Sequence, residues 1–403
     1  MSVLHITDPV VFDDTIASRE YHTYLPYAST SYNNDDEIRI PIFNQDSYTV
    51  PSESFLLLEG NILRTPPAAA LDNNTRIVVN GFAHLFSDIR YELNGIVIDQ
   101  TKNPGIATSM KLWCSIPYEK SQLHGADGWN NDKVLVRDSG KFQVEIPLKH
   151  LLGFAEDYKK IILNIKQELV LIRAHTDRNV WVAGTADKNR LSMNLTKVAW
   201  RIPHITVSDV ARVELLKILE KDPWIEMGFM NWELHEYPLL ATTTSHTWTV
   251  KSSTKLETPR FILLAFQTGR KNDDDKNASK FDHCTISSMK LYLNGIQFPY
   301  DNIAADFSNN RYVRLYHMFS YFAQAYYNRD QGSVIPYDNF KTICPIVAID
   351  CSNQNEVLKS GAVDVRIEWE TKDDVAADTT AYCLILHDRV VRYRPLSSLV
   401  HTM

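Results

Sequence analysis

The four residues Leu-Asn-Gly-Ile occur twice in this chain of 403 residues, once from Leu93 and again 200 positions later from Leu293. Apolar and polar residues alternate before each copy, in SDIRYELNGI and in SSMKLYLNGI. Such alternation lets one face of a β-strand be buried. Asn-Gly favours a tight type I′ turn because both residues tolerate a positive φ. Each copy therefore predicts a β-hairpin.

Two further pairs of similar segments are each separated by about 200 residues. YTVPSES begins at Tyr48 and WTVKSST at Trp248, again 200 positions apart. Each is followed by an apolar run, FLLLEG from Phe55 and FILLAF from Phe261. Repeats of this kind indicate duplication of a structural unit, although two β-domains can also share a few strand motifs by chance. We interpret the chain as a duplicated domain.

Each hairpin is followed by a predicted helix. Asn103 as N-cap and Pro104 at the first helical position predict the first one. The second is expected from Ser308 to Tyr327, where apolar residues recur with helical spacing. Its apolar stripe comprises Tyr312, Leu315, Tyr316, Phe319, Phe322, Ala323 and Tyr326. A third helix, VSDVARVELLKILEKDP, is predicted to connect the halves, with Ser208 as its cap and Pro223 after its end. We expect Val210, Val213, Leu216 and Leu219 to line one side of it.

The remaining apolar runs predict strands without βαβ alternation. They include EIRIPI, KFQVEIPL, IILNIKQELVLIRA, AVDVRIEWE and AYCLILHDRVVRY. About eight strands per half, joined by long loops, favour antiparallel jelly rolls over a seven-stranded immunoglobulin sandwich. We therefore predict an all-β fold of two tandem eight-stranded jelly rolls, with short helices in loops and an inter-domain helix. The expected division is an N-terminal arm at 1–35, jelly roll 1 at 36–205, a connecting helix or linker at 206–224, jelly roll 2 at 225–395 and a C-terminal tail at 396–403.

Composition narrows the class of protein. The chain is 44% hydrophobic and 23% charged, which is typical of a soluble globular protein. It contains no apolar run of the roughly 18–20 residues that would predict a membrane span. The start, MSVLHITDPVVFDDT, lacks the pattern of a secretory signal, and five scattered cysteines favour free thiols in a reducing compartment such as cytoplasm or nucleus. A net charge of −7 argues against a broad nucleic-acid-binding surface.

We predict no catalytic, cofactor-binding or metal-binding residues. The G-x-S-x-G, G-x-x-x-x-G-K-[ST] and G-x-G-x-x-G motifs do not occur. LHEYP lacks the second histidine of a zinc-protease motif, and its proline would break the required helix. The aspartates Asp273 to Asp275 could attract a cation, but a solvated loop tip flanked by lysines is the simpler interpretation. The pair Trp369-Glu370 is better explained as a core residue beside a surface residue than as a sugar-processing site.

The two-domain layout resembles the double jelly-roll major capsid proteins of DNA viruses and their relatives in polinton- and adintovirus-like elements and in arthropod genomes. The residues that carry the resemblance are SREYHTYLPYASTSYNNDDEIRIPIFNQDSYTVPSESFLLLEG from Ser18, YELNGIVID and MKLYLNGI. The resemblance implies a structural protein rather than an enzyme, without cofactors. It implies homotrimeric, pseudo-hexagonal capsomers that tile an icosahedral virion or virus-like shell. The implied partners are further copies of the chain and a minor pentameric capsid protein.

Two alternatives remain at this point. A glycan-processing enzyme built on two jelly rolls would need a carboxylate cluster at the domain junction, and the sequence identifies none. A domesticated binding protein would keep the fold without forming a shell. In the capsid interpretation, the inter-subunit surfaces are the helix from Ser308 and an arm rich in tyrosine, although both could equally pack on their own domain. The tyrosines of the arm are Tyr21, Tyr24, Tyr27 and Tyr32.

Overall fold

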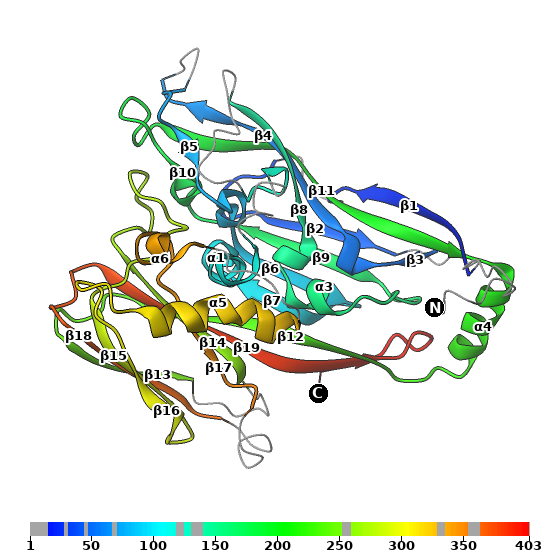
Figure 1. Ribbon diagram of the computed structural model, residues 1–403. Helices are drawn as coiled ribbons and strands as arrows, with labels where there is room; N and C mark the ends of the chain where they lie inside the picture. The colour runs from blue at the N-terminus through cyan, green and yellow to red at the C-terminus, as the bar shows by residue number, and fades with distance from the viewer. Residues whose placement is uncertain are drawn as a thin grey trace, which may run out of the picture.

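The chain forms two jelly rolls, shown in Figure 1 with the first in blue to green and the second in green to red. The computed structural model describes residues 15–27, 31–43, 47–66, 71–117, 125–129, 140–251, 259–328, 335–353 and 363–402. Residues 1–14 and 28–30 of the predicted arm therefore lie outside the described residues. Every strand pairing between the named strands is antiparallel.

The first jelly roll consists of two sheets. One has the strand order β1-β11-β4-β8, with β3 added to β11, and the other has the order β2-β9-β6-β7. A separate two-stranded sheet joins β5 and β10. The strands are β1 (Ile16–Tyr24), β2 (Glu37–Ile42), β3 (Tyr48–Thr49), β4 (Phe55–Arg64), β5 (Arg76–Ile77), β6 (Phe86–Leu93), β7 (Ile96–Lys102), β8 (Lys141–Pro147), β9 (Gln167–Arg173), β10 (Trp181–Val182) and β11 (Leu191–Val207).

The second jelly roll repeats this arrangement. Its sheets have the orders β12-β19-β14-β17, with β20 added to β19, and β13-β18-β15-β16. The strands are β12 (Ile225–Tyr237), β13 (Ser245–Lys251), β14 (Pro259–Thr268), β15 (Ile286–Leu293), β16 (Ile296–Ala304), β17 (Val347–Asp350), β18 (Val365–Thr371), β19 (Thr379–Tyr393) and β20 (Val400–Thr402). Strand for strand, β1 corresponds to β12, β7 to β16, β8 to β17 and β11 to β19. The predicted double jelly roll is confirmed.

Short helices lie in the connections. The α-helices are α1 (Pro104–Ser115), α3 (Gly153–Asp157), α4 (Asp209–Glu220), α5 (Val313–Tyr327) and α6 (Tyr337–Ile343). The 3₁₀ turns are η1 (Pro51–Glu53), η2 (Gly81–Leu85), η4 (Leu148–His150) and η5 (Arg178–Val180). Helices α1 and α5 occupy equivalent positions, since each follows the hairpin of its own half.

The two Asn-Gly turns have the same backbone geometry. In the first, φ is 49° at Asn94 and 81° at Gly95; in the second, it is 51° at Asn294 and 79° at Gly295. Positive φ at both central residues is the requirement of a type I′ turn. The turns join β6 to β7 and β15 to β16, so the repeated sequence marks the same corner of both jelly rolls.

Alternation in the strands builds the cores. In β2, Ile38, Ile40 and Ile42 are buried while their polar neighbours are not. In β18, Val365, Ile367 and Trp369 alternate in the same way with exposed or half-buried residues. Each jelly roll is filled by one large hydrophobic cluster. Each cluster also includes residues from the other half, so the two cores meet.

Helix α5 begins later than the sequence predicts. The carboxylate of Asp306 accepts hydrogen bonds from the backbone N–H groups of Ser308 and Asn309, which holds this segment in a turn. The helix therefore begins at Val313 rather than near Ser308. Its predicted buried stripe is largely confirmed, with four helix residues fully buried. They are Leu315, Phe319, Phe322 and Ala323.

The connecting helix forms as predicted, but its apolar side is not covered by the described residues. Helix α4 lies at one end of the molecule (Figure 1) and has no buried residue. Val210, Val213 and Leu216 are all exposed.

Part of the predicted arm also differs from expectation, because residues 16–24 form β1 and pair with β11. The division into the domain ranges given above stays a prediction.

The equivalent turns generate a matched pair of variants. We expect Gly95→Ala and Gly295→Ala each to lower the free energy of unfolding by about 1–2 kcal/mol, because a Cβ is unfavourable at positive φ. No atom lies within 4 Å of either added Cβ, so steric clashes do not contribute. Urea denaturation of both variants measures the two losses. Clearly unequal losses would contradict the structural equivalence of the two hairpins.

Candidate functional site

The two jelly rolls meet at a junction formed by elements from both halves. Strand β12, which begins the second jelly roll, packs against β7 and α3 of the first. At Gly153 in α3, an added Cβ would lie 1.8 Å from the backbone oxygen of Met230 in β12. Any other residue at this position would push the two halves apart. Glycine therefore permits the close approach of the two jelly rolls.

A buried charge cluster lies at this junction. The side chain of Lys111, in α1, is completely buried and forms an ion pair with Glu156 of α3. From the second jelly roll, the hydroxyl groups of Tyr326 and Tyr327 donate hydrogen bonds to the two oxygens of Glu156, at 2.9 and 2.6 Å. The Lys111 ammonium also lies 4.8 Å from the ring centre of Trp232, which is a favourable cation–π distance. The cluster thus joins both halves.

The ionisation of this cluster follows from burial. Burial lowers the pKa of Lys111, and the neighbouring carboxylate of Glu156 opposes that shift. Burial and the same carboxylate raise the pKa of Tyr326 and of Tyr327 well above the usual value. Both hydroxyls therefore stay protonated and act as donors. A charge pair satisfied in this way fixes the position of the helices without needing solvent.

Two further carboxylates hold the backbone at the junction. Asp99 of β7 accepts a hydrogen bond of 2.8 Å from the N–H of Phe154, in the first turn of α3. Asp157 accepts one of 2.8 Å from the N–H of Met230 in β12. Burial raises the pKa of each carboxyl to about 6, although these N–H groups favour the ionised form. Both groups therefore titrate below neutral pH.

A second line of contacts runs beside a cavity between the jelly rolls. The amide of Asn103, which stands at the predicted N-cap of α1, donates instead to Glu236 of β12 at 2.7 Å. Lys271 forms an ion pair with the same carboxylate at 3.1 Å. The indole of Trp113 donates to the backbone oxygen of Ser279 at 2.8 Å. The cavity has a volume of about 260 Å³, and of these residues Asn103 and Lys271 line it.

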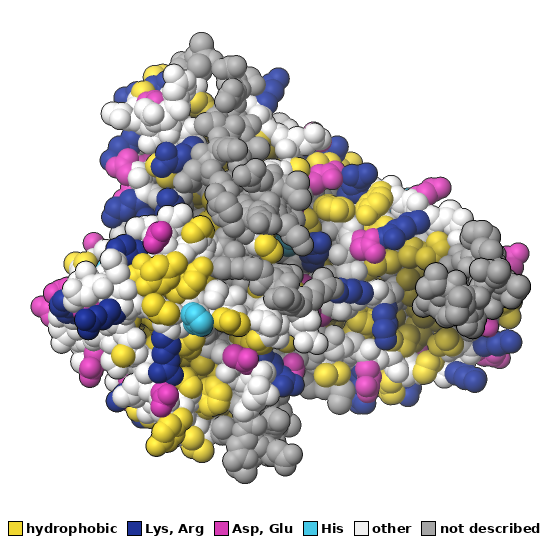
Figure 2. Space-filling model, in the orientation of Figure 1, with side chains coloured by type: hydrophobic (Ala, Val, Ile, Leu, Met, Phe, Trp, Pro, Cys, Tyr) yellow, Lys and Arg dark blue, Asp and Glu magenta, His cyan; other side chains and the backbone are white. Residues whose placement is uncertain are grey.

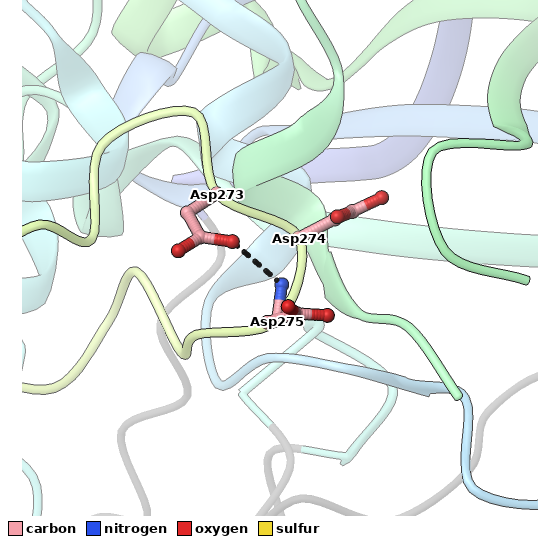
Figure 3. A group of neighbouring side chains, drawn as sticks. All are labelled: Asp273, Asp274 and Asp275. Carbon is pink, nitrogen blue, oxygen red and sulfur yellow. Dashed lines mark hydrogen bonds between the residues drawn. The ribbon is translucent and has the colours of Figure 1, made fainter. Parts of the chain in front are cut away.

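The three consecutive aspartates belong to the same junction (Figure 3). Their carboxylate oxygens lie within 4.8 Å of one another. Asp274 is buried and accepts a hydrogen bond of 2.7 Å from the N–H of Asn189 in the first jelly roll. Asp275 forms an ion pair with Lys188, and Asp273 accepts from the N–H of Asp275. The prediction of a solvated loop tip is wrong for Asp274, because this residue is buried against the other half, whereas Asp275 is exposed.

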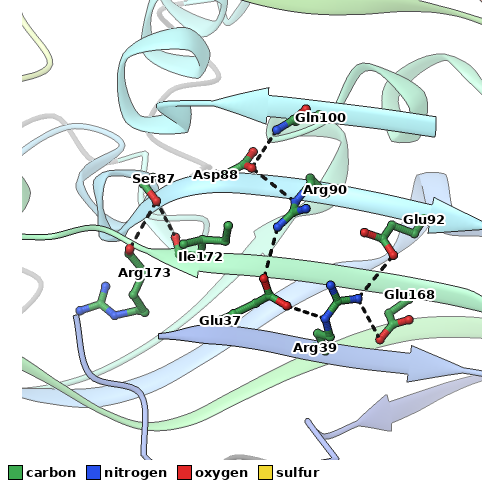
Figure 4. A network of polar contacts seen from close by, with 10 residues as sticks. All are labelled: Glu37, Arg39, Ser87, Asp88, Arg90, Glu92, Gln100, Glu168, Ile172 and Arg173. Atoms are coloured by element: carbon green, nitrogen blue, oxygen red, sulfur yellow. Dashed lines mark hydrogen bonds and ion pairs between the residues drawn. The ribbon is translucent and has the colours of Figure 1, made fainter. Parts of the chain in front are cut away.

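The outer face of the sheet β2-β9-β6-β7 carries a network of charges (Figure 4). The guanidinium of Arg39 lies 3.5 Å from Glu92 and 3.6 Å from Glu168, and both carboxylates are almost completely buried. Arg90 pairs with Glu37 and with Asp88, each at 3.4 Å. Cross-strand pairs of opposite charge stabilise a sheet and leave its surface polar. This face therefore does not resemble an apolar interface.

Exposed apolar groups gather instead around α5, on the face shown in Figure 2. A hollow of about 300 Å³ lies between α5, β16 and β17. Its lining includes Phe298, Met318 and Tyr321, with Arg314 and Asp350 among them. The neighbouring Tyr300 is 94% exposed. Large aromatic groups left open in this way are typical of a surface that contacts another protein.

The residues that were candidates for a catalytic or metal site are accounted for by packing and by contacts within the protein. Trp369 is buried and Glu370 exposed, as predicted. All five cysteines are free. The enzyme alternative required carboxylates at the junction, and Glu156 and Asp157 do lie there; both oxygens of Glu156 are engaged by Lys111 and tyrosine hydroxyls, as described above. Sequence reasoning missed these carboxylates because nothing in the local pattern distinguishes them. Among the described residues, no helix has the length and apolar character needed to cross a membrane.

The model of the double jelly roll-like domain matches residues 75–391. The chain belongs to this family. The resemblance noted in the sequence is thereby confirmed at the level of the fold family. No curated protein matches the sequence.

Solved structures of similar fold include proteins of PBCV-1, Faustovirus and mavirus. The VP54 protein of PBCV-1, in a fit to a reconstruction of the virophage Sputnik, has a TM-score of 0.61 at 11% identity, covering 98% of each chain. The Faustovirus major capsid protein has a TM-score of 0.58 at 8% identity, covering 97% of this chain and 92% of that one. The mavirus major capsid protein has a TM-score of 0.55 at 12% identity, covering 100% and 95%. Structures with this fold therefore match the chain over essentially its whole length.

The buried cluster allows a test of the junction. We expect Glu156→Gln to lower the free energy of unfolding by about 3–5 kcal/mol, because it leaves the Lys111 ammonium buried without a carboxylate. Lys111→Met should cost less, since Glu156 keeps two tyrosine donors. The double variant should be more stable than Glu156→Gln alone. Urea denaturation measures all three, and a double variant as unstable as the sum of both singles would contradict this account.

The buried aspartates predict an unusual dependence on pH. A carboxyl whose folded-state pKa is raised to about 6 stabilises the fold below its unfolded value near 4, and that stabilisation is lost as the pH rises through 6. For Asp99 the change is on the order of 3 kcal/mol. We expect Asp99→Asn to flatten the stability profile between pH 4 and 6. Urea denaturation across this range measures it, and an unchanged slope would exclude Asp99 as its source.

Proposed function

We propose that this chain is a structural capsid subunit, which forms homotrimers and then a shell of pseudo-hexagonal capsomers. The single observation that carries the proposal is the head-to-tail contact between the two jelly rolls. The first jelly roll presents β7, α1 and α3, and the second presents β12 together with the C-terminal end of α5. The two contacting surfaces are therefore different, so a further copy can add at either end.

The surfaces equivalent to this contact are open in a single chain. Strand β1 corresponds to β12, yet eight of its nine residues are exposed, whereas β12 buries Met227, Phe229 and Trp232. The side formed by β16 and α5 corresponds to that formed by β7 and α1, and it carries the apolar hollow described above. Tyr21 on β1 and Tyr321 on α5 are both exposed. The β1 side of the first jelly roll and the β16–α5 side of the second thus offer, to other chains, the same kind of contact that joins the two jelly rolls within one chain.

Repetition of this contact between chains gives a closed ring when the rotation fits. Three chains contribute six jelly rolls, which accounts for a trimer with pseudo-hexagonal outline. The similarity to the Faustovirus and mavirus major capsid proteins over the whole chain supports the same use of the fold. The proposed location of the assembled protein is a virion or virus-like shell. Its five-fold positions would need a separate pentameric capsid protein.

Light scattering after size-exclusion chromatography tests the trimer. We expect a particle of about 140 kDa, three times the 46.2 kDa chain, or larger shells visible by negative-stain microscopy. Tyr21→Asp and Tyr321→Asp should each give monomers of unchanged circular dichroism, because a charge is unfavourable in a desolvated interface. Val210→Asp on α4 is the control and should keep the trimer. A wild-type monomer at micromolar concentration would refute the proposal, and trimers without shells would favour a domesticated binding protein.

A further inference from the structure

Two histidines lie where β1 joins the body of the first jelly roll. His22 on β1 and His204 on β11 have ring centres 4.4 Å apart. The side chain of His204 is buried, whereas His22 is exposed. Two imidazoles at this distance pack well while neutral and repel each other when both are protonated. The attachment of β1 therefore contains a pair of groups that change charge with pH.

His204 also links β1 to a second segment through hydrogen bonds. Its Nε2 lies 2.9 Å from the hydroxyl of Tyr24 on β1, and its Nδ1 lies 2.6 Å from the hydroxyl of Ser47, next to β3. Both partners are hydroxyl groups, which can either donate or accept. Their hydrogen bonds alone therefore do not prevent protonation of His204. Burial and the second imidazole are what disfavour the charge.

The charged groups around the pair come from β1, β3 and β11. Glu20 stands opposite His204 in the strand register and is exposed, so water screens its charge. From β3, the residues paired with β11 are Tyr48 and Thr49. Arg19 and Arg201 belong to the alternate set of side chains, where they pair with Glu53 and Glu145. Among the described residues, Glu20 is thus the carboxylate that stands opposite the pair.

Strand β1 depends strongly on this attachment. It pairs with β11 and no other strand among the described residues, and its side chains are mostly exposed. An edge strand with little burial opens at a lower free energy than the core of a domain. Its counterpart β12 is held by the buried junction with the first jelly roll. A change in charge at the pair is therefore expected to act on β1 before it acts on the rest of the fold.

We propose that His22 and His204 form an acid-operated latch, in which protonation of the pair releases β1 from β11. The consequence for assembly rests on the proposed function: because β1 is the strand presented to a neighbouring subunit, its release opens the contact between subunits. Acidification would then loosen the trimer without unfolding the jelly rolls. Such a latch would couple disassembly to an acidic environment.

The direction of the pH effect follows from burial. Burial, together with the charge of His22, lowers the pKa of His204 from its ordinary value of 6.5 to about 4. A histidine with a depressed pKa stabilises the fold above its ordinary value, and this contribution is lost as the pH falls from 6.5 toward 4. The window for release is therefore pH 6.5 to 4. This is the opposite direction from the effect of the buried aspartates at the junction.

Hydrogen exchange of the full chain, resolved by segment and corrected for the intrinsic rate at each pH, tests the latch. We expect protection of residues 16–24 to fall at least tenfold between pH 7.5 and 4.5, while protection of β12 changes little. The double variant His22→Gln, His204→Gln keeps side-chain hydrogen-bonding groups but cannot titrate, and it should hold β1 at both pH values. The control His175→Gln removes an exposed histidine outside β1 and should behave like the wild type.

Several outcomes would overturn the latch. One is unchanged protection of β1 in the wild type, and another is an equal loss in the double variant. A third is simultaneous exchange of β1 and β12, which indicates global acid unfolding. Light scattering at the same pH values tests the coupling to assembly: trimers that dissociate near pH 4.5 in the wild type but persist in the double variant support it, and trimers that persist in both refute it. Absence of trimers at every pH would refute the proposed function but not the latch, because the exchange of β1 is measurable in a monomer.

Discussion

The arrangement of the molecule depends on the contact of β12 with α3 and β7. Gly153 has no side chain at the point where the backbone of Met230 passes, so the second jelly roll can lie directly against the first. The carboxylates of Asp99 and Asp157 then hold backbone N–H groups on both sides of this contact. Because the contact is close and polar groups within it are paired, the two jelly rolls have one relative position. Every surface proposed for assembly follows from that position.

The buried ion pair of Lys111 and Glu156 holds the two halves together at the junction. Burying two charges is costly, and an ion pair recovers this cost only when the remaining donors and acceptors are also satisfied. Here two tyrosine hydroxyls from α5 complete the coordination of the carboxylate. A general acid or base needs access to a substrate, whereas this carboxylate is occupied by protein donors. The same groups that a glycan-processing enzyme would use therefore join the halves.

Much of the fold could be predicted because the relevant signals are local. Alternation in β2 and β18 and the two Asn-Gly turns predicted strands and hairpins that the structure confirms. The start of α5 was wrong by five residues, since the turn around Asp306 competes with the helix through side-chain hydrogen bonds to its own backbone. The aspartates at Asp273 to Asp275 were assigned to solvent, because their acceptor role depends on Asn189 and Lys188, which are distant in sequence. The exposure of α4 likewise could not be predicted, because it depends on which other parts of the chain pack against the helix.

The sequence by itself determined the duplication, the antiparallel character of both halves and the family, because strand alternation and turn chemistry act between neighbouring residues. Only the tertiary structure decided how the halves meet, since that contact joins residues such as Lys111 and Tyr327 across more than two hundred positions. It also decided which equivalent surfaces are covered and which stay open: β12 buries Met227, Phe229 and Trp232, whereas β1 is almost entirely exposed, although both begin a jelly roll. The physical reason is that burial of a strand face depends on what packs against it, and local sequence does not encode that neighbour.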